Sequence, residues 1–319
     1  MPLSPATRAI PAATGALHAI ATLDGRFRRY KIVHDAADTP GAAEDQQAHR
    51  ARVVACFNPA NDTSASFLLR RPSLHPIYTP AGLPVTEQGA HNYPHHKGVF
   101  LTVGKIDNTN VYVDTTHNSG RLEAREVSSR TEGDALVLDT EIVWLDEAER
   151  VLIVERRIHR FYAGAQTGYG AQANRIDVDS QLRTPITAGV NLPQNKHGYF
   201  HARVVDALDE EDGGSVTASN GITGADAIVE TDGYWIDTRG AIGPSGVGIV
   251  IMVHPSFGPQ PLFARTYGLI ALNPFAREGR RLERGQVCRN VYSVWAYDDP
   301  ATFDVAQAFE IFARSAVIE

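Results

Sequence analysis

Short runs of alternating apolar and polar residues dominate the chain and predict β-strands. Two of the clearest runs, 135–144 and 151–160, are rich in Val, Leu and Ile, and the turn signal Glu132-Gly133-Asp134 precedes the first. Comparable runs predict further strands at 52–57, 99–103, 111–114, 200–205, 248–253, 269–272 and 291–297, with another turn at 212–214. Helical spacing of apolar residues is convincing only in the tail at 300–315, where Ala301, Val305, Ala308, Phe309 and Phe312 fall on one face.

No alternation of strands with helices and no internal repeat is visible, so the pattern predicts an all-β fold. The expected architecture is a large antiparallel β-sandwich of two sheets with a short C-terminal helix. A chain of 319 residues with 43% hydrophobic residues is long enough for one such domain over 1–319, or for two ordinary domains. Residues 35–47, rich in Ala, Asp, Glu and Gln, are expected to form an exposed loop, with a short helix as the alternative.

Composition and charge narrow the partners and the compartment. The net charge of −7 and the sequence pI near 5.9 disfavour a nucleic-acid or anionic-membrane partner, which would require a basic face. The cysteines Cys56 and Cys288 lie among apolar residues, which favours buried free thiols over a disulfide and indicates a reducing compartment. Neither a signal-peptide core nor a run of about 20 apolar residues is visible. We expect a cytoplasmic protein with a small-molecule or oligosaccharide ligand, and the oligomeric state stays open.

Side chains that can carry chemistry concentrate in the segment 83–100. This segment holds His91, His95 and His96, together with one carboxylate and one ammonium, Glu87 and Lys97. Its prolines and glycines predict a loop that delivers the histidines into the strand expected at 99–103. Histidine changes charge near neutral pH, so such a cluster suits proton transfer, metal binding or contacts to a polyhydroxylated ligand.

The spacing within this segment leaves a metal site open without requiring one. Neutral imidazoles of His91 and His95 would suit Zn, Mn, Fe or Ni. On a strand, His95 and His96 would point to opposite faces, so only an irregular loop brings both to one site. Glu87, the nearest carboxylate, either orients a ring nitrogen or acts as a base, or is a solvated charge.

Three other places carry candidate ligand contacts. His254 ends the strand expected at 248–253 and either faces a cleft or bonds to the backbone of the following turn. Arg265 and Asn273 flank the strand expected at 269–272, and the Arg265 guanidinium can bind vicinal hydroxyls or a carboxylate through two parallel N–H groups. In 195–203, polar and apolar residues alternate, which predicts that His201 and Arg203 share one face.

Common catalytic signatures are absent from the sequence. It contains no GxSxG, GxxxxGK[ST], CxxC or HExxH motif and no GxGxxG following a strand. Nucleotide hydrolases, dinucleotide oxidoreductases and common serine hydrolases are therefore disfavoured.

The histidine segment and its neighbours resemble a known family. The residues concerned are 74–82, which include His-Pro-Ile-Tyr-Thr-Pro-Ala-Gly, then Pro-His-His-Lys-Gly at 94–98, His-Pro-Ser at 254–256, and 267–275. In this order the sequence is similar, over about two-thirds of its length, to the bacterial family known as PmoA-like or DUF6807. The PmoA label names an integral membrane subunit of a methane oxygenase, which does not suit a sequence without a membrane-spanning run.

The resemblance implies a sandwich similar to that of the galactose mutarotases and a role beside sugar-converting enzymes, although fold alone does not fix function. Family members commonly carry an acidic residue and another histidine just before Pro-His-His, where this sequence has Asn92 and Tyr93. That departure weakens a metal site in this segment, and His91 is the candidate replacement for the missing ring. We therefore expect no obligatory cofactor, with a divalent metal as the alternative.

These observations favour an enzyme that uses histidines for proton transfer on a sugar or sugar derivative, as a lyase, hydrolase or epimerase. The alternatives are a glycan-binding sandwich module without catalysis and a metal-dependent oxygenase, which requires two histidines and a carboxylate. The histidines at 75, 91, 95, 96 and 254 are expected to converge. The candidate catalytic residues are His95, His96, Glu87 and His254, and the candidate substrate contacts are His75, His91, Arg71, Lys97, Arg203, Arg265 and Asn273.

Overall fold

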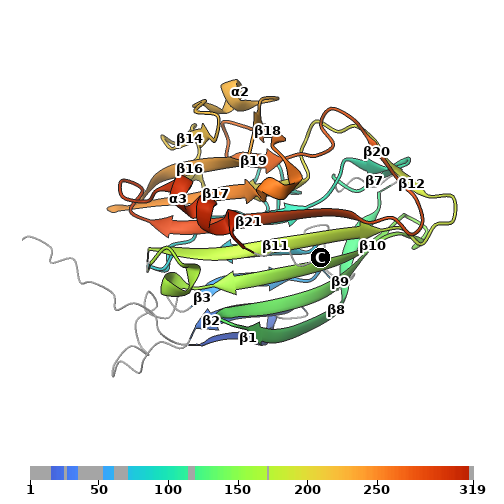
Figure 1. Ribbon diagram of the computed structural model, residues 1–319, viewed down its shortest axis with the longest axis horizontal. Coiled ribbons are helices and arrows are strands. Elements are labelled where there is room, and N and C mark those ends of the chain that lie inside the picture. The colour runs from blue at the N-terminus through green and yellow to red at the C-terminus, as the bar shows by residue number, and fades with distance from the viewer. Residues whose placement is uncertain are drawn as a thin grey trace, which may run out of the picture.

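Two large antiparallel sheets form the protein (Figure 1). The computed structural model describes residues 16–24, 27–34, 53–60, 71–113, 119–170 and 172–315. The nine-stranded sheet has the order β1 (Leu17–Asp24), β2 (Phe27–His34), β3 (Val53–Asn58), β4 (Ser73–Ile77), β5 (Val99–Leu101), β13 (Phe200–Arg203), β19 (Leu269–Leu272), β18 (Gln260–Ala264) and β15 (Asp232–Gly233). The eight-stranded sheet has the order β14 (Ser215–Ala218), β16 (Trp235–Ile242), β17 (Ser245–Val253), β21 (Cys288–Asp298), β11 (Ala173–Arg183), β10 (Val151–Tyr162), β9 (Ala135–Leu145) and β8 (Arg121–Glu132).

Smaller elements decorate these sheets. Two small two-stranded sheets accompany them: the hairpin of β6 (Lys105–Ile106) with β7 (Thr109–Asn110), and the pairing of β12 (Val190–Leu192) with the distant β20 (Arg280–Leu282). The helices are the 3-10 turns η2 (Gly164–Thr167), η3 (Asp206–Leu208) and η4 (Pro255–Phe257), and the α-helices α2 (Ala225–Ile228) and α3 (Val305–Ala313).

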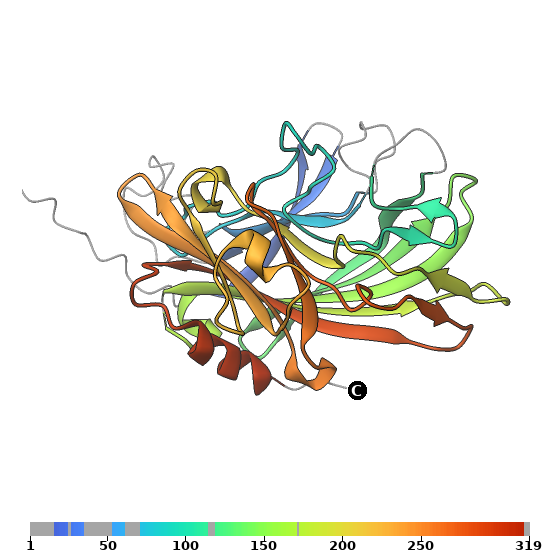
Figure 2. The ribbon, with the colours of Figure 1, turned by 90° about the horizontal axis from the view of Figure 1, so that it is seen from above.

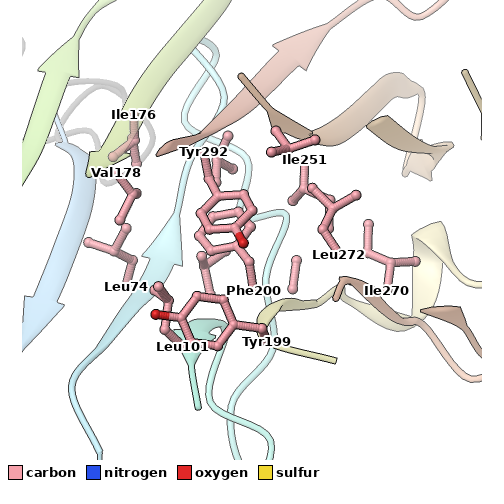
Figure 3. Packing of buried hydrophobic residues seen from close by; sticks show 14 of the residues in the cluster. Leu74, Leu101, Ile176, Val178, Tyr199, Phe200, Ile251, Ile270, Leu272 and Tyr292 are labelled. Carbon is pink, nitrogen blue, oxygen red and sulfur yellow. The ribbon is translucent and has the colours of Figure 1, made fainter. Parts of the chain in front are cut away.

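The main core lies between the two sheets, which Figure 2 shows as separate layers. Phe200 of the nine-stranded sheet stacks on Tyr292 of the eight-stranded sheet, with ring centroids 4.4 Å apart. Leu272 and Ile251 belong to the same buried cluster (Figure 3). Alternate residues of each strand supply this core, as expected for a sandwich with one face of each sheet turned inward. The predicted two-sheet antiparallel sandwich is confirmed.

Helix α3 covers part of the outer face of the eight-stranded sheet (Figure 2). Its buried residues Val305, Ala308 and Phe312 join a second apolar cluster that includes Trp295 of β21. Asp304 starts the helix, because its carboxylate accepts hydrogen bonds from two backbone N–H groups of the first turn. The C-terminal helix expected within 300–315 is therefore confirmed, and it is shorter than the pattern predicted.

The described residues test the strand expected at 111–114 but not the loop expected at 35–47. The strand predicted at 111–114 is wrong over its described part, because β7 ends at Asn110 and 111–113 form no ladder. The Asn110 side chain accepts hydrogen bonds from the backbone N–H groups of Tyr112 and Val113, at 2.9 and 3.2 Å. Such local side-chain bonds compete with strand pairing. The loop expected at 35–47 lies outside the described residues.

The structure also shows the state of the two cysteines and the character of the helices. Cys56 and Cys288 are both buried and free, which confirms that prediction. In the described part of the chain, no helix combines the length and the apolar character that crossing a membrane requires.

Several buried charges find their counter-charge within the same strand. Arg157 binds Glu155 two residues earlier on the inner face of β10, with Nε 2.7 Å from Oε1, and both side chains are at most 1% exposed. On the outer face of the eight-stranded sheet, Arg175 pairs with Asp177, and Arg239 pairs with Asp237. Residues two apart lie on the same side of a strand, so each pair forms without a neighbouring strand.

Candidate functional site

A row of side chains crosses the outer face of the nine-stranded sheet. Phe100, His201, Ala271 and Phe263 lie opposite one another in the ladders of β5, β13, β19 and β18. Their sequence neighbours Leu101, Phe200 and Leu272 point into the main core, so the row points outward. Arg203 follows His201 on the same face of β13. The prediction that these two residues share a face is confirmed.

The segment Glu87–Gly98, here called the histidine loop, lies against this row. It is closed by backbone hydrogen bonds from Gly89 N to His96 O and from Gly98 N to Glu87 O, and it is anchored to β13 by Glu87 N, which donates to Arg203 O. Gly98 has φ +68°, and a Cβ there would lie 2.4 Å from Leu74 O. Only glycine fits this close approach of the loop to β4.

Planar rings from four parts of the chain meet here. The histidine cluster comprises the imidazoles of 95, 96, 197 and 201 with the phenols of 93, 112 and 267. Tyr93 stacks on His96 and on Tyr267, with centroids 5.1 and 4.6 Å apart. His95 lies edge-on to His96 at 4.5 Å and to Tyr112 at 5.5 Å. His95, Tyr93 and Tyr267 are half-buried, so the cluster is accessible from this side.

The irregular backbone explains why both neighbouring histidines join the cluster. Residues 94 and 95 form a turn instead of a strand, and His96 N donates to Tyr93 O. The alternation that would separate two consecutive strand residues therefore does not apply. The His95 ring is half-exposed, whereas the His96 ring is buried beneath Tyr93 and is 2% exposed.

His197 and His201 reach the cluster from the β12–β13 connection. His201 stacks flat on Phe100 at 4.5 Å and 2°, and its Nε2 donates to the carbonyl oxygen of His197 at 3.0 Å. This donation makes Nδ1 of the neutral ring an acceptor. Gly198 permits the contact, because a Cβ there would lie 2.7 Å from Nε2 of His201.

Asn273, a predicted substrate contact, is buried and supports this connection. Its Nδ2 donates to Asn195 O at 2.6 Å, and its Oδ1 accepts from Phe275 N at 3.0 Å. Asn195 in turn accepts from His197 N at 2.8 Å and donates to Gly198 O at 3.0 Å. Both ends of the buried Asn273 amide are thus occupied in holding the backbone under His197.

Positive charge surrounds the rings. The buried Arg71 guanidinium lies over the Phe100 and Tyr112 rings and donates to Tyr112 O. Arg203 Nε binds Glu87 Oε2 at 2.8 Å, and its guanidinium lies over Tyr267. Glu87 is predicted to orient a ring nitrogen or act as a base, with a solvated charge as the alternative. In the structure its carboxylate pairs with Arg203.

Lys97 has a structural contact as well. Its ammonium is buried and donates to Pro94 O within the histidine loop. This bond stabilises the turn that presents His95, so Lys97 acts on the site through loop geometry. Its assignment as a direct substrate contact is not supported by this placement.

The four imidazoles are kept neutral. Burial lowers the pKa of His95 to about 4 and that of His96 to about 2, and nearby positive charges add to both shifts. Burial also lowers the pKa of His201 to about 3, and burial with Lys196 and Arg265 lowers the pKa of His197. Neutral rings can accept a proton or a hydrogen bond at physiological pH.

Two of these rings carry buried acceptor or donor atoms without a protein partner. Within the described residues, Nδ1 of His96 and Nδ1 of His201 are buried and make no hydrogen bond. Buried polar atoms are normally paired, so an unpaired one calls for a ligand or a water molecule. Both atoms belong to the histidine cluster.

The other expected histidines lie elsewhere. His75 sits on β4, where its Nδ1 is 3.2 Å from Thr86 Oγ1, and burial lowers its pKa to about 4. His91 is exposed on the histidine loop. Within the described residues neither has a ring contact with the cluster, whereas the rings of His95 and His96 contact each other at 4.5 Å.

The placement of His254 across a cleft from His95 is wrong. Its ring packs edge-on against Phe312 of α3, 5.2 Å between centroids, on the outer face of the other sheet. Its Nε2 donates to Ala313 O at 3.2 Å, while Nδ1 accepts from Ser256 N at 3.3 Å. His254 therefore caps the turn η4 and holds the end of α3. This corresponds to the alternative of a turn histidine bonded to backbone.

The spacing of side-chain donor atoms shows where a metal ion could be held. In the described part of the chain, one set of three His, Cys, Asp or Glu side chains has its donor atoms within 4.8 Å of one another, namely Asp206, Asp209 and Asp212. The histidine cluster does not present such a set. Its rings are stacked side by side, which suits contacts to a ligand face better than chelation.

Acidification is expected to destabilise the protein through the buried rings. His201 is fully buried, and its pKa falls from 6.5 to about 3 in the fold. Between these values only the unfolded chain binds the proton, so the stability from this group is complete above pH 6.5 and falls by about 1.4 kcal/mol per pH unit below it. His201→Phe, which preserves the stack on Phe100, should reduce the slope. Urea unfolding measured at several pH values tests this; equal slopes in both proteins would contradict it.

Several cluster residues were not assigned a role from sequence. In the sequence, Tyr93 stands out only as a departure from the related family, Tyr267 only as the start of the family-like segment 267–275, and Tyr112 not at all. His197 and His201 were noticed through alternation, without a way to tell whether their face meets solvent or ligand. Placing His197 and His201 beside His95 requires knowledge that β13 pairs with β5 and β19.

The chain matches a family model and is distantly similar to solved structures. A family model described as "Family of unknown function (DUF6807)" matches residues 48–310. No curated protein matches the sequence. The structure is similar to "heparan sulfate lyase HepC from Pedobacter heparinus", with 8% identity and a TM-score of 0.30 over 90% of this chain and 36% of that chain.

A second similar structure is "Putative kojibiose phosphorylase from human microbiome", with 8% identity and a TM-score of 0.29 over 62% of this chain and 24% of that chain. The chain thus spans well under two-thirds of either protein. Likeness at these scores carries no argument about function, which has to come from the residues of the site.

Proposed function

Because the chain belongs to DUF6807, a family of unknown function, we propose its function from the chemistry of the histidine cluster. The proposed function is an enzyme that binds a sugar or sugar derivative on the outer face of the nine-stranded sheet and transfers protons through neutral imidazoles. The observation that carries the proposal is the gathering of four low-pKa histidines, two of which have unpaired buried Nδ1 atoms.

His95 is the candidate for the proton-transferring group. Its ring is half-exposed, contacts His96 and Tyr112, and has a pKa of about 4, lowered first by burial and then by Arg71, Lys97 and His197. A neutral imidazole that touches the ligand can take a proton from a C–H or O–H group. His96, buried behind it, acts as a positioning residue for the His95 ring.

The surrounding groups suit a polyhydroxylated ligand. The phenols of Tyr93 and Tyr267 provide half-buried ring surface at the same side, and sugar rings pack on such surface. The unpaired Nδ1 atom of His201 is buried and can accept a hydrogen bond from a water molecule that links it to the ligand. This combination of flat rings with few polar atoms is typical of small-ligand sites.

The test is a screen of sugars and sugar derivatives in D2O, followed by proton NMR. Solvent deuterium at a ring carbon with the sugar otherwise intact indicates epimerase chemistry, a new unsaturated product indicates a lyase, and new anomeric signals indicate a hydrolase. Turnover that disappears on replacing His95 supports the proposal. Ligand-induced changes of the histidine ring signals without any product would favour the alternative, a glycan-binding module.

A further inference from the structure

Arg265 stands at the edge of the histidine cluster, directly after β18. Its guanidinium carbon lies 4.3 Å from the Phe263 ring centroid. Phe263 is 6.4 Å from the His197 ring, which stacks on Tyr112 at 5.3 Å. The half-buried Arg265 is therefore connected to the cluster through a continuous set of rings.

Within the described ranges, Arg265 differs from Arg203 in having no counter-charge. Arg203 binds Glu87, but no described carboxylate lies within ion-pair distance of Arg265. Among the same residues its guanidinium donates a long hydrogen bond, from Nη1 to Ala264 O at 3.4 Å. Stacking on Phe263 fixes the plane of the group while leaving its N–H edge for another partner.

The charge of Arg265 acts on the cluster. It contributes to the lowered pKa of His197 and opposes the burial that raises the pKa values of Tyr112 and Tyr267. Two carboxylates nearby are already engaged: Glu87 is paired with Arg203, and Glu211 accepts a hydrogen bond from Thr266 Oγ1 at 2.8 Å. An anion would therefore be attracted to the Arg265 guanidinium itself, where partial burial strengthens attraction.

Resting on the proposed function, we propose that the ligand is a sugar acid whose carboxylate binds Arg265. The planar guanidinium presents two parallel N–H groups that match the two carboxylate oxygens. The hydroxyls of the same ligand would then lie against the imidazoles. Neutralisation of the carboxylate also makes a neighbouring C–H more acidic, which would assist proton removal by His95.

Binding of matched ligands to the full chain tests this proposal. Calorimetry would compare D-glucuronate and D-galacturonate with D-glucose and D-galactose, with the methyl esters of the two acids, and with acetate. The acids should bind about tenfold or more tightly than the neutral sugars and esters, since a charged hydrogen-bonded pair contributes about 1.5–3 kcal/mol. Arg265→Gln should remove that preference, and Arg265→Lys should restore part of it.

Arg183→Gln is the matched control, because Arg183 is exposed on β11 of the other sheet. It should leave the preference for acids unchanged. Equal affinity for acids and neutral sugars, or a preference that survives Arg265→Gln, would overturn the proposal. Acetate that binds as tightly as the uronates would also overturn it, because the sugar would then contribute nothing.

The same samples separate this proposal from the proposed function. Neutral sugars that shift the ring signals of the four cluster histidines in carbon-proton NMR, with no advantage for acids, would remove the sugar-acid assignment alone. Failure of every sugar and acid to bind, or binding that leaves all four rings unaffected, would remove both.

Discussion

Replacement of His95 by glutamine should lower turnover about 10²- to 10⁴-fold, the usual contribution of a positioned acid or base. The half-exposed ring has a pKa of about 4, so it is neutral at physiological pH and able to accept a proton. The wild-type rate should be steady near neutrality and fall as pH decreases through about 4, when the ring becomes protonated. Steady-state kinetics on a sugar identified by the NMR screen would measure both effects.

His18→Gln is a suitable control, because His18 is exposed on β1. The free energy of unfolding of both variants should stay within about 1 kcal/mol of wild type, as is usual away from packed sites. A His95→Gln protein with unchanged turnover would exclude the ring from the reaction. A rate that rises on acidification through pH 4 would show that the protonated ring is the active form.

Glu155→Gln should cost about 3–5 kcal/mol of unfolding free energy, because it leaves the Arg157 charge buried without compensation. Glu155 is fully buried and accepts from Trp144 Nε1 at 2.9 Å, from Ser180 Oγ at 2.7 Å, and from two nitrogens of Arg157. A glutamine amide would direct N–H groups at some of these donors. Urea unfolding followed by circular dichroism would measure the loss.

Glu149→Gln provides the matched comparison. Glu149 also binds an arginine, Arg121, through both carboxylate oxygens, but its side chain is 60% exposed. Exposed ion pairs contribute about 0–1 kcal/mol, so this variant should be nearly as stable as wild type. Similar losses in the two variants would show that burial does not set the importance of the Glu155 pair.

The sequence predicted the fold where strands are rich in apolar residues. Strands β9, β10, β17 and β21 each contain a run predicted from its pattern and extend beyond it, and β19 coincides with its run. Strand β11 was not identified, because Arg175, Asp177 and Asp179 interrupt its apolar signal. These residues are buried only because each finds a partner, and such partners cannot be seen from local pattern.

The site was predictable as a loop of histidines but not as a complete cluster. Pro94 and Gly98 correctly indicated an irregular segment around His95 and His96. His201 comes close to His95 and His96 because β13 pairs with β5 in a register that joins residues about a hundred positions apart. His254 was misplaced for the same reason, since sequence does not tell which sheet a strand joins or which face a helix covers.

The ion pairs within single strands have a consequence for how the sheets align. A pair such as Glu155 with Arg157, or Arg175 with Asp177, forms wherever its strand is extended, whatever strand lies beside it. The attraction between the two charges neutralises the strand by itself and does not distinguish the correct neighbour or alignment from one shifted by two residues. That choice falls to the hydrogen bonds that the same carboxylates accept from adjacent strands, such as those from Trp144 and Ser180 to Glu155, and to the apolar side chains, the bulges and the turns. Moving such a charged pair from one strand to another should therefore disturb the alignment of the sheet less than exchanging core residues of similar size.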